Sequence, residues 1–264
     1  MSVVTELIMA GVLVGFMVGL TGVGGGSLMT PLLIFVFGQT PSTAVGSDMF
    51  FACGTKLVGT AMHHKHNSVN WKVVSLLAAG SIPASVLVLL YLGMTNSSSG
   101  KSFFVMALLG TIIFLAGTQM VGWLKFNPRP LQIKEDIGVR KPYLTILFGA
   151  ILGGLVTLTS IGAGALGVVL LRTLYPKTLR IASLVGTDLA HAIPLTLVAG
   201  IGYLSMGAIQ FSMVGYLLCG SVPGVIIGSL LANKIKAHIV ANILGLLMMV
   251  VGIKTFLAAL ETYV

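Results

Sequence analysis

Thr21-Gly22-Val23-Gly24-Gly25-Gly26-Ser27-Leu28 returns about 140 residues later as Thr159-Ser160-Ile161-Gly162-Ala163-Gly164-Ala165-Leu166. Two further elements repeat at the same distance: Val45-Gly46-Ser47-Asp48 as Val185-Gly186-Thr187-Asp188, and Gly80-Ser81-Ile82-Pro83 as Gly220-Ser221-Val222-Pro223. The chain is therefore read as an internal duplication. It has a first repeat over residues 1–124, a linker over 125–141 and a second repeat over 142–264.

The composition indicates that the chain lies in a lipid bilayer. Of its 264 residues 56% are hydrophobic and 8% are charged, and the mean hydropathy is +1.05. A soluble fold of this composition would leave large apolar areas in water. The formal net charge of +9 does not indicate a nucleic-acid partner, because the basic residues lie in short connections between apolar spans. Cys53 and Cys219 lie in apolar segments of opposite halves and are predicted to be packing residues.

Apolar runs predict the membrane helices. Six runs can each cross a bilayer alone, at about 20 residues per crossing: residues 42–62, 72–92, 102–124, 180–204, 210–231 and 237–260. The opening segments of the two halves, residues 5–37 and 142–174, are too long for one span and short for two, and the glycine-rich break interrupts each near its middle. The predicted fold is an all-α, polytopic integral membrane protein.

The placement of basic residues decides how the opening segments run. If each segment enters the membrane, turns at its glycines and returns, twelve of the 15 basic residues face one side. These are Lys65, Lys72, Lys125, Arg129, Lys134, Arg140, Lys141, Arg172, Lys177, Arg180, Lys234 and Lys236. The positive-inside rule then puts both termini outside the cell membrane. Each half crosses an odd number of times, which predicts an inverted repeat of six full spans and two glycine-broken helical hairpins, or eight to ten membrane segments.

The glycine-rich breaks predict an anion site. A helix restarting after such a break points free N–H groups and its positive dipole end toward the break, where an anion is stabilised. Two such helix ends, one from each half, can converge near the midplane. The residues predicted to bind substrate are Thr21, Gly22, Gly24, Gly25, Gly26, Ser27, Thr159, Ser160, Gly162 and Gly164. The alternative is that the small residues only allow close helix packing.

Asp48 and Asp188 are the acidic residues that lie inside apolar spans. A carboxylate at this depth is costly, so it is paired, protonated or functional. Two roles stay open: a proton carrier for coupled transport, or an acceptor that holds the neighbouring backbone of the break. Four more residues are assigned with these two aspartates as coupling or site-supporting residues: Ser47, Lys56, Thr187 and His191.

The sequence predicts neither a cofactor nor an enzyme. His63, His64 and His66 surround Lys65 at the end of a span, and we interpret this cluster as an interfacial helix end rather than a metal site. No Cys-His pair, carboxylate pair or set of metal ligands occurs at a useful spacing.

The paired glycine-rich openings, the Gly-Ser-Asp and Gly-Thr-Asp elements and the repeated Gly-Ser-x-Pro segments resemble the TauE/SafE sulfite exporter family over essentially the whole chain. Membership implies a bacterial inner-membrane carrier built as an inverted repeat, which moves anions such as sulfite, thiosulfate or organosulfonates, usually outward. The family's break falls on Gly22 to Ser27 and on Ser160 to Ala165, and its motif aspartates fall on Asp48 and Asp188.

These observations predict a secondary transporter that exports a small sulfur-containing anion by alternating access. Proton coupling stays open, because the inside-negative potential already favours anion exit. The alternatives are an anion channel and a cation transporter that uses the intramembrane aspartates. The expected partners are the anion and the lipid bilayer of the cell inner membrane. The oligomeric state is left open, with a homodimer among the alternatives.

Overall fold

The computed structural model describes residues 2–21, 26–64, 69–94, 99–121, 140–161, 164–175, 181–231 and 237–263. Within these ranges the chain forms ten α-helices and no strand. They are α1 (Val3–Thr21), α2 (Gly26–Phe35), α3 (Pro41–His64), α4 (Trp71–Met94), α5 (Ser99–Met120), α6 (Arg140–Thr159), α7 (Ala165–Leu174), α8 (Ile181–Ser205), α9 (Phe211–Leu231) and α10 (Ala237–Tyr263). The predicted linker, residues 125–141, lies outside the described residues except for its last two.

The helices follow the apolar pattern of the sequence. The six predicted runs coincide with α3, α4, α5, α8, α9 and α10. In the described part of the chain, five helices have a stretch long and apolar enough to cross a membrane: Val3–Leu20, Trp71–Met94, Pro142–Thr159, Ser183–Ser205 and Phe211–Leu231. The protein is therefore a multi-pass membrane protein by helix length and composition.

Both opening segments are broken where the glycines predict. The first divides into α1, with 19 residues, and α2, with 10, and the second into α6, with 20, and α7, with 10. At 1.5 Å per residue, α2 and α7 are each about 15 Å long, or roughly half the hydrocarbon thickness of a bilayer. The arms of each segment are thus unequal, with a long helix followed by a half-length one.

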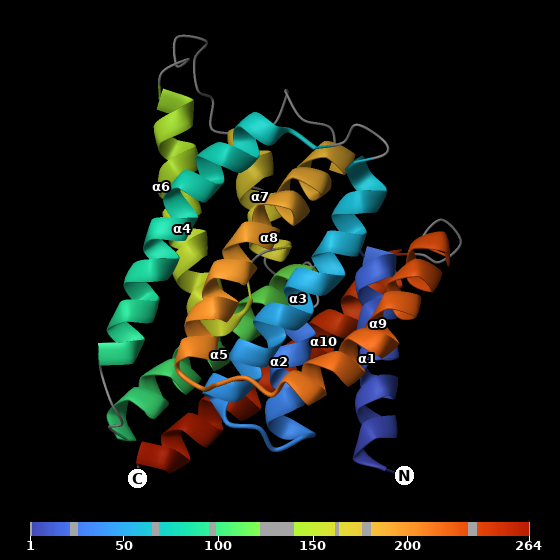
Figure 1. The fold of residues 1–264 in the computed structure, drawn as a ribbon, viewed down its shortest axis with the longest axis vertical. Coiled ribbons are helices and arrows are strands. Elements are labelled where there is room, and N and C mark those ends of the chain that lie inside the picture. Colours follow the sequence, from blue (N-terminus) through green and yellow to red (C-terminus); the bar gives the residue numbers. More distant parts are fainter. Residues whose placement is uncertain are drawn as a thin grey trace.

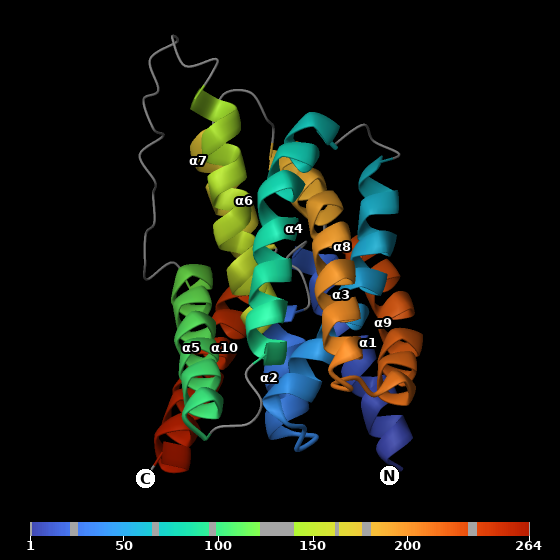
Figure 2. The same cartoon turned by 60° about the vertical axis from the view of Figure 1, so that its left-hand side comes forward.

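Corresponding helices of the two halves run in opposite directions in the figures. In Figure 1, α1 rises from the end marked N and α2 returns toward that end, whereas α6 descends from the opposite end and α7 returns upward. Helix α3 rises and α8 descends in the same way. Figures 1 and 2 both place the N and C labels at the same end of the bundle.

The two halves interlock rather than lie apart. The opening helix of each half packs against the fourth helix of the other, so that α1 contacts α9 and α6 contacts α4. The third helices, α3 and α8, pack against each other, and so do the fifth helices, α5 and α10. This set of pairs is unchanged when the two halves are exchanged.

Small residues allow the interlocked helices to approach closely. The positions where a Cβ would stand on Gly11, Gly15 and Gly19 of α1 fall against the backbone of α9, at Leu217, Ser221 and Val225. Gly220, Gly224 and Gly228 of α9 face the backbone of α1 in return. In the other pair, α6 presents Gly149 and Gly153 to α4, and α4 presents Gly80 to α6. Dispersion contacts between close backbones are what holds helices together in lipid, where apolar burial gives little.

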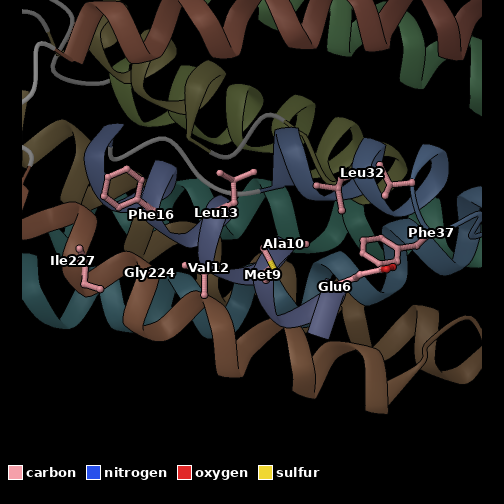
Figure 3. A pocket seen from close by; sticks show the side chains of 11 residues that line it. Glu6, Met9, Ala10, Val12, Leu13, Phe16, Leu32, Phe37, Gly224 and Ile227 are labelled. Carbon is pink, nitrogen blue, oxygen red and sulfur yellow. The ribbon is translucent and has the colours of Figure 1, made fainter. Parts of the chain in front are cut away.

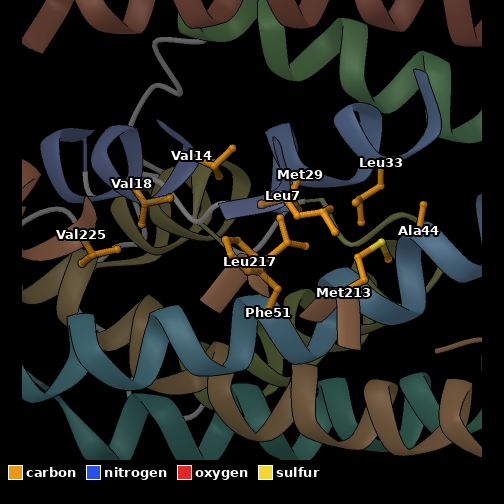
Figure 4. Close-up of a cluster of buried hydrophobic side chains, with 10 residues drawn as sticks. All are labelled: Leu7, Val14, Val18, Met29, Leu33, Ala44, Phe51, Met213, Leu217 and Val225. Carbon is orange, nitrogen blue, oxygen red and sulfur yellow. The ribbon is translucent and has the colours of Figure 1, made fainter. Parts of the chain in front are cut away.

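Polar and apolar side chains are distributed as expected for a bundle surrounded by lipid. Large apolar side chains are exposed on the outside, for example Leu90, Ile227 and Ile253, whereas Ser81, Thr187 and His191 are fully buried. A cluster of ten apolar residues fills the space between α1, α2, α3 and α9 (Figure 4). The polar interior described below lies between α3 and α8.

Two glycines of α9 test the packing argument. Gly220→Ala should destabilise the protein by about 1–3 kcal/mol, because its Cβ would overlap the backbone of Ile8 and Val12, and overpacking a tight contact costs this much. Gly215 on the same helix has nothing within 4 Å of its Cβ position. Gly215→Ala should therefore leave stability unchanged or raise it by up to about 1 kcal/mol. Thermal unfolding in detergent measures both, and equal destabilisation would contradict the proposed role of Gly220.

Candidate functional site

Four ionisable side chains are buried where the two halves meet. Asp48 and Lys56 come from α3, and Asp188 and His191 come from α8. Each is at most 1% exposed. Since α3 and α8 belong to opposite halves and pack against each other, this cluster lies on the contact between the halves. Burial of so many charged and polar groups is expensive unless they hold one another or a ligand.

The Asp48 carboxylate holds the half-length helix α2. Its Oδ2 accepts a hydrogen bond of 2.5 Å from the hydroxyl of Thr30, in the second turn of α2. The backbone N–H of Thr30 and the hydroxyl of Ser160 also interact with this carboxylate. Ser160 belongs to the second break, so Asp48 links the broken segments of both halves. Its Oδ1 has no hydrogen-bond partner among the described residues.

Asp188 has the equivalent place in the second half but different partners. Its carboxylate interacts with the backbone N–H of Gly164, the residue before α7, and the N-terminus of this helix has no side-chain cap. Asp188 Oδ1 lies against Gly167 at a point where any side chain would overlap it. This oxygen also has no hydrogen-bond partner in the described part of the chain.

Lys56 interacts electrostatically with both aspartates. Its electrostatic interaction with Asp188 is larger than that with Asp48. The repeat aligns Lys56 with Thr196, so this positive charge is present in one half alone. In a low-dielectric interior a buried ammonium needs such carboxylates or an anion nearby.

His191 is fixed through one of its two ring nitrogens. Its Nε2 lies 2.8 Å from the hydroxyl oxygen of Ser81 on α4, the serine of the repeated Gly-Ser-x-Pro element. Its Nδ1 is buried and has no partner among the described residues. His191 therefore keeps one free hydrogen-bonding position in the polar interior.

The hydroxyl residues before the aspartates bind backbone of the opposite half. Ser47 Oγ accepts the N–H of Gln210, one residue before α9, at 3.3 Å. Thr187 Oγ1 accepts the N–H of Asn70, one residue before α4, at 3.0 Å. The repeat aligns Asn70 with Gln210, so the two contacts are equivalent and lie toward opposite ends of the bundle. The Gln210 side chain also donates to Gln39 Oε1 at 3.0 Å.

The second break has the irregular backbone that the sequence predicts. Ser160 has a φ of 58° and Gly164 a φ of 123°, both in the left-handed region that interrupts a helix. The Thr159 hydroxyl donates to Leu155 O at 2.7 Å and accepts the N–H of Ile161 at 3.2 Å, so it supports the break itself. Ser160 Oγ lies 3.9 Å from Met49 Sδ on α3.

Part of the predicted binding set is not described by the structure. Gly22, Gly24, Gly25 and Gly162 lie outside the described residues. Thr21, Gly26 and Ser27 have helical backbone, and their side chains are not described. Of the predicted set, Ser160 and Gly164 are the residues that the structure brings to the two aspartates.

An apolar groove lies away from this cluster. It has a volume of about 670 Å³ on the outer side of α1, α2 and α9, and its lining is apolar apart from Glu6 (Figure 3). A second groove, of about 360 Å³, lies between α4 and α8 and includes Leu90, Met94 and Ser205. Both are surfaces that suit lipid chains better than an oxyanion, which needs polar donors.

Comparison with known proteins agrees with this architecture. The family model of the sulfite exporter TauE/SafE matches residues 7–255. The chain belongs to the TauE/SafE family. Similar proteins include the probable membrane transporter protein YjnA of Bacillus subtilis, 37% identical over 79% of this chain and 82% of its own length. A probable membrane transporter protein of Methanocaldococcus jannaschii is 28% identical over 75% of this chain and 72% of its own length. No solved structure matches the chain.

This TauE/SafE chain is thus a membrane transporter by family. Its candidate site includes residues that the sequence alone did not identify. Thr30, Ser81 and Gly167 each contact one of the buried ionisable residues. Ser81 carried a signal, because it belongs to a repeated element. Thr30 and Gly167 carried none, since a lone hydroxyl or glycine in an apolar run is common in membrane helices.

Removing the Thr30 hydroxyl tests its bond to Asp48. Thr30→Val keeps the side-chain volume and leaves the carboxylate without its shortest partner, so it should destabilise the protein by about 1.5–3 kcal/mol in thermal unfolding. The matched control is Thr111→Val on α5. That hydroxyl is exposed and donates to a carbonyl of its own helix, Ala107 O. A Thr30→Val protein no less stable than the Thr111→Val protein would show that Asp48 does not depend on this hydroxyl.

Proposed function

We propose that this protein is a secondary transporter that moves a small sulfur-containing anion across the cell inner membrane by alternating access. The candidate substrates are sulfite, thiosulfate and an organosulfonate such as sulfoacetate. The observation that carries the proposal is a buried ammonium, Lys56, in the same cluster as the N-terminus of α7 where the two halves meet. The name of the matched family model, which is that of a sulfite exporter, supports the class of substrate.

The arrangement of the halves supports an inverted repeat. Corresponding helices run in opposite directions (Figures 1 and 2), and the four main helix pairs, α1–α9, α6–α4, α3–α8 and α5–α10, are unchanged when the halves are exchanged. Two halves of this kind can rock against each other around a fixed central site, exposing it alternately to the two sides. The equivalent contacts Ser47–Gln210 and Thr187–Asn70 join the two halves toward opposite ends of the bundle. A rocking motion would break one of these contacts while the other stays formed. Both termini lie at one end of the bundle (Figures 1 and 2), as the proposal that both face the outside requires.

In this proposal the anion is bound by the two breaks together. Backbone N–H groups of Gly22 to Ser27 and of Gly162 to Gly164 would take its oxygens, with Thr21, Ser27, Thr159 and Ser160 as hydroxyl donors. Ser47, Asp48, Thr187, Asp188 and His191 would hold these elements in place or carry coupled protons. Lys56 would supply the opposite charge.

A cation transporter is the second candidate, and one observation favours it. Asp48 and Asp188 each keep a buried oxygen without a described hydrogen-bond partner. Two such carboxylate oxygens are ligands that a small cation prefers. An anion channel would use the same breaks as a filter. Saturable exchange of labelled for unlabelled substrate distinguishes a carrier from a channel.

Ligand-dependent unfolding tests the sign and class of the substrate. Purified protein is heated with sulfite, thiosulfate, sulfate, sulfoacetate, taurine, chloride or divalent cations at equal concentrations. A ligand at about 100 times its dissociation constant should stabilise the protein by about 2.7 kcal/mol. We expect this with one or two of the sulfur-containing anions.

Variants locate that ligand. Ser160→Gly removes a hydroxyl and tolerates the left-handed backbone at this position, so it should fold and should weaken anion binding about tenfold, the equivalent of one lost hydrogen bond. Replacement of Gly24 and Gly162 by leucine should abolish binding. Thr111→Val on the outer face of α5 is the control. Stabilisation by a cation alone, lost in Asp48→Asn, would favour the second candidate instead.

A further inference from the structure

The Asp188 carboxylate has the surroundings expected for a bound anion. It lies against Gly167 in the first turn of α7, a helix of ten residues, and it interacts with the backbone N–H of Gly164 just before that helix. Its electrostatic interaction with Lys56 is the strongest that Lys56 makes. These are the donor and the charge to which the proposed substrate would bind. Asp188 is 1% exposed, and its Oδ1 has no hydrogen-bond partner among the described residues. The place of the anion is therefore taken by a group of the protein itself.

The first half does not have this arrangement. Asp48 is held by the Thr30 hydroxyl at 2.5 Å and by Ser160. In the second half Val168 stands where Thr30 stands in the first, so no equivalent hydroxyl holds Asp188. Gly167 stands in place of Met29, and the missing side chain leaves the space into which Asp188 Oδ1 fits. Asp188 thus depends on a helix N–H and a lysine, both of which an anion can take over.

The charges in the cluster limit when an anion can bind. Lys56 stands against two carboxylates, so the empty site carries an excess of one negative charge if all three groups are ionised. A bound monovalent anion would add a second negative charge, at a depth in the membrane where an uncompensated charge is costly. One proton on a carboxylate restores the original charge. If that carboxylate is Asp188, the proton also removes the negative charge that competes with the anion for Lys56.

We propose that the carboxylate of Asp188 occupies the anion's place in the empty protein, and that the anion takes Lys56 and the Gly164 N–H from it when this carboxyl binds a proton. The inference rests on the proposed function and assigns its coupling. The proton enters from the same aqueous side as the anion, resides on the Asp188 carboxyl while the anion is bound, and leaves with it. One proton then accompanies each anion that binds.

Other groups around Asp188 do not replace it in this role. The titratable groups of the described helices packed against α8 that face the cluster are Asp48, Cys53 and Lys56, all on α3. His191 lies on α8 itself and is held through Nε2 by Ser81 of α4. On α6 and α7, Tyr143 and Arg172 are exposed near the helix ends. Asp48 has in Thr30 a hydroxyl partner that the proposed anion site does not use, which leaves Asp188 as the carboxylate to be displaced.

Binding measured as a function of pH tests the proposal. Thiosulfate and sulfoacetate are used as probes, because both keep their charge between pH 6 and pH 8. Titration calorimetry in two buffers of different ionisation enthalpy counts the protons taken up. We expect the purified wild-type protein to take up about one proton per anion bound at the upper end of this range, with an affinity that falls about tenfold per pH unit.

The Asp188→Asn variant distinguishes the proposed coupling role of Asp188 from a purely structural role. An asparagine oxygen can still accept the Gly164 N–H, but it carries no charge that competes for Lys56. At pH 8 this variant should bind the probe at least tenfold more tightly than wild type, with one proton fewer taken up and a correspondingly flatter pH profile. Lys56→Gln should lose binding at every pH. Glu261→Gln, an exposed acid on α10, is the matched control and should behave as wild type.

The outcomes distinguish this inference from the function on which it rests. Proton uptake by wild type together with tighter, less pH-dependent binding by Asp188→Asn supports it. Binding by wild type without proton uptake, or an Asp188→Asn protein that binds more weakly than wild type, overturns it and leaves the anion transporter in place. If neither these probes nor the other sulfur-containing anions bind to wild type at any pH, both proposals fail.

Discussion

A helix that breaks inside a bilayer leaves backbone N–H groups that only the protein can satisfy, since no water is available there. In this chain the solution is a carboxylate from the next helix. Asp188 on α8 interacts with the N–H of Gly164 at the start of α7, and Asp48 on α3 accepts the hydroxyl of Thr30 in α2. Once two carboxylates are buried for this purpose, a counter-charge is needed, and Lys56 interacts electrostatically with both. The breaks therefore account for the charged interior, and the charged interior for the chemistry proposed above.

The same breaks depend on close packing elsewhere in the bundle. A half-length helix such as α2 or α7 is stable only when neighbouring helices pack against it, because a helix of this length is only marginally stable in isolation. The long helices before the breaks, α1 and α6, are locked to the opposite half through glycines that bring backbones into contact. Each half thus holds the first arm of the other's broken segment. A motion of one half against the other would carry these pairs along as units.

Much of the fold could be predicted from the sequence, but only part of the site. Apolar run length predicted helices such as 72–92, observed as Trp71–Met94, and the glycines predicted the breaks after Thr21 and Thr159. The contacts that join distant segments had no such signal. Nothing in the local pattern says that Ser47 accepts the N–H of Gln210, or that Gly167 makes room for Asp188, because periodicity describes one helix at a time. The repeat identified the two aspartates as candidate site residues, whereas the residues that contact them depend on how the two halves pack together.

The departures from the repeat carry as much information as the repeat itself. Two identical halves would give a site with two equivalent carboxylates and no net preference for either. Lys56 aligns with Thr196, His191 with Phe51 and Thr30 with Val168, so positive charge and hydroxyls are divided unequally around the two aspartates. Asp48 is fixed by hydroxyls, whereas Asp188 is held by a lysine and a helix end that can also accept a substrate. The symmetric arrangement of helices can thus open to either side of the membrane in turn, while the asymmetric charged centre can differ between the empty and the anion-bound protein.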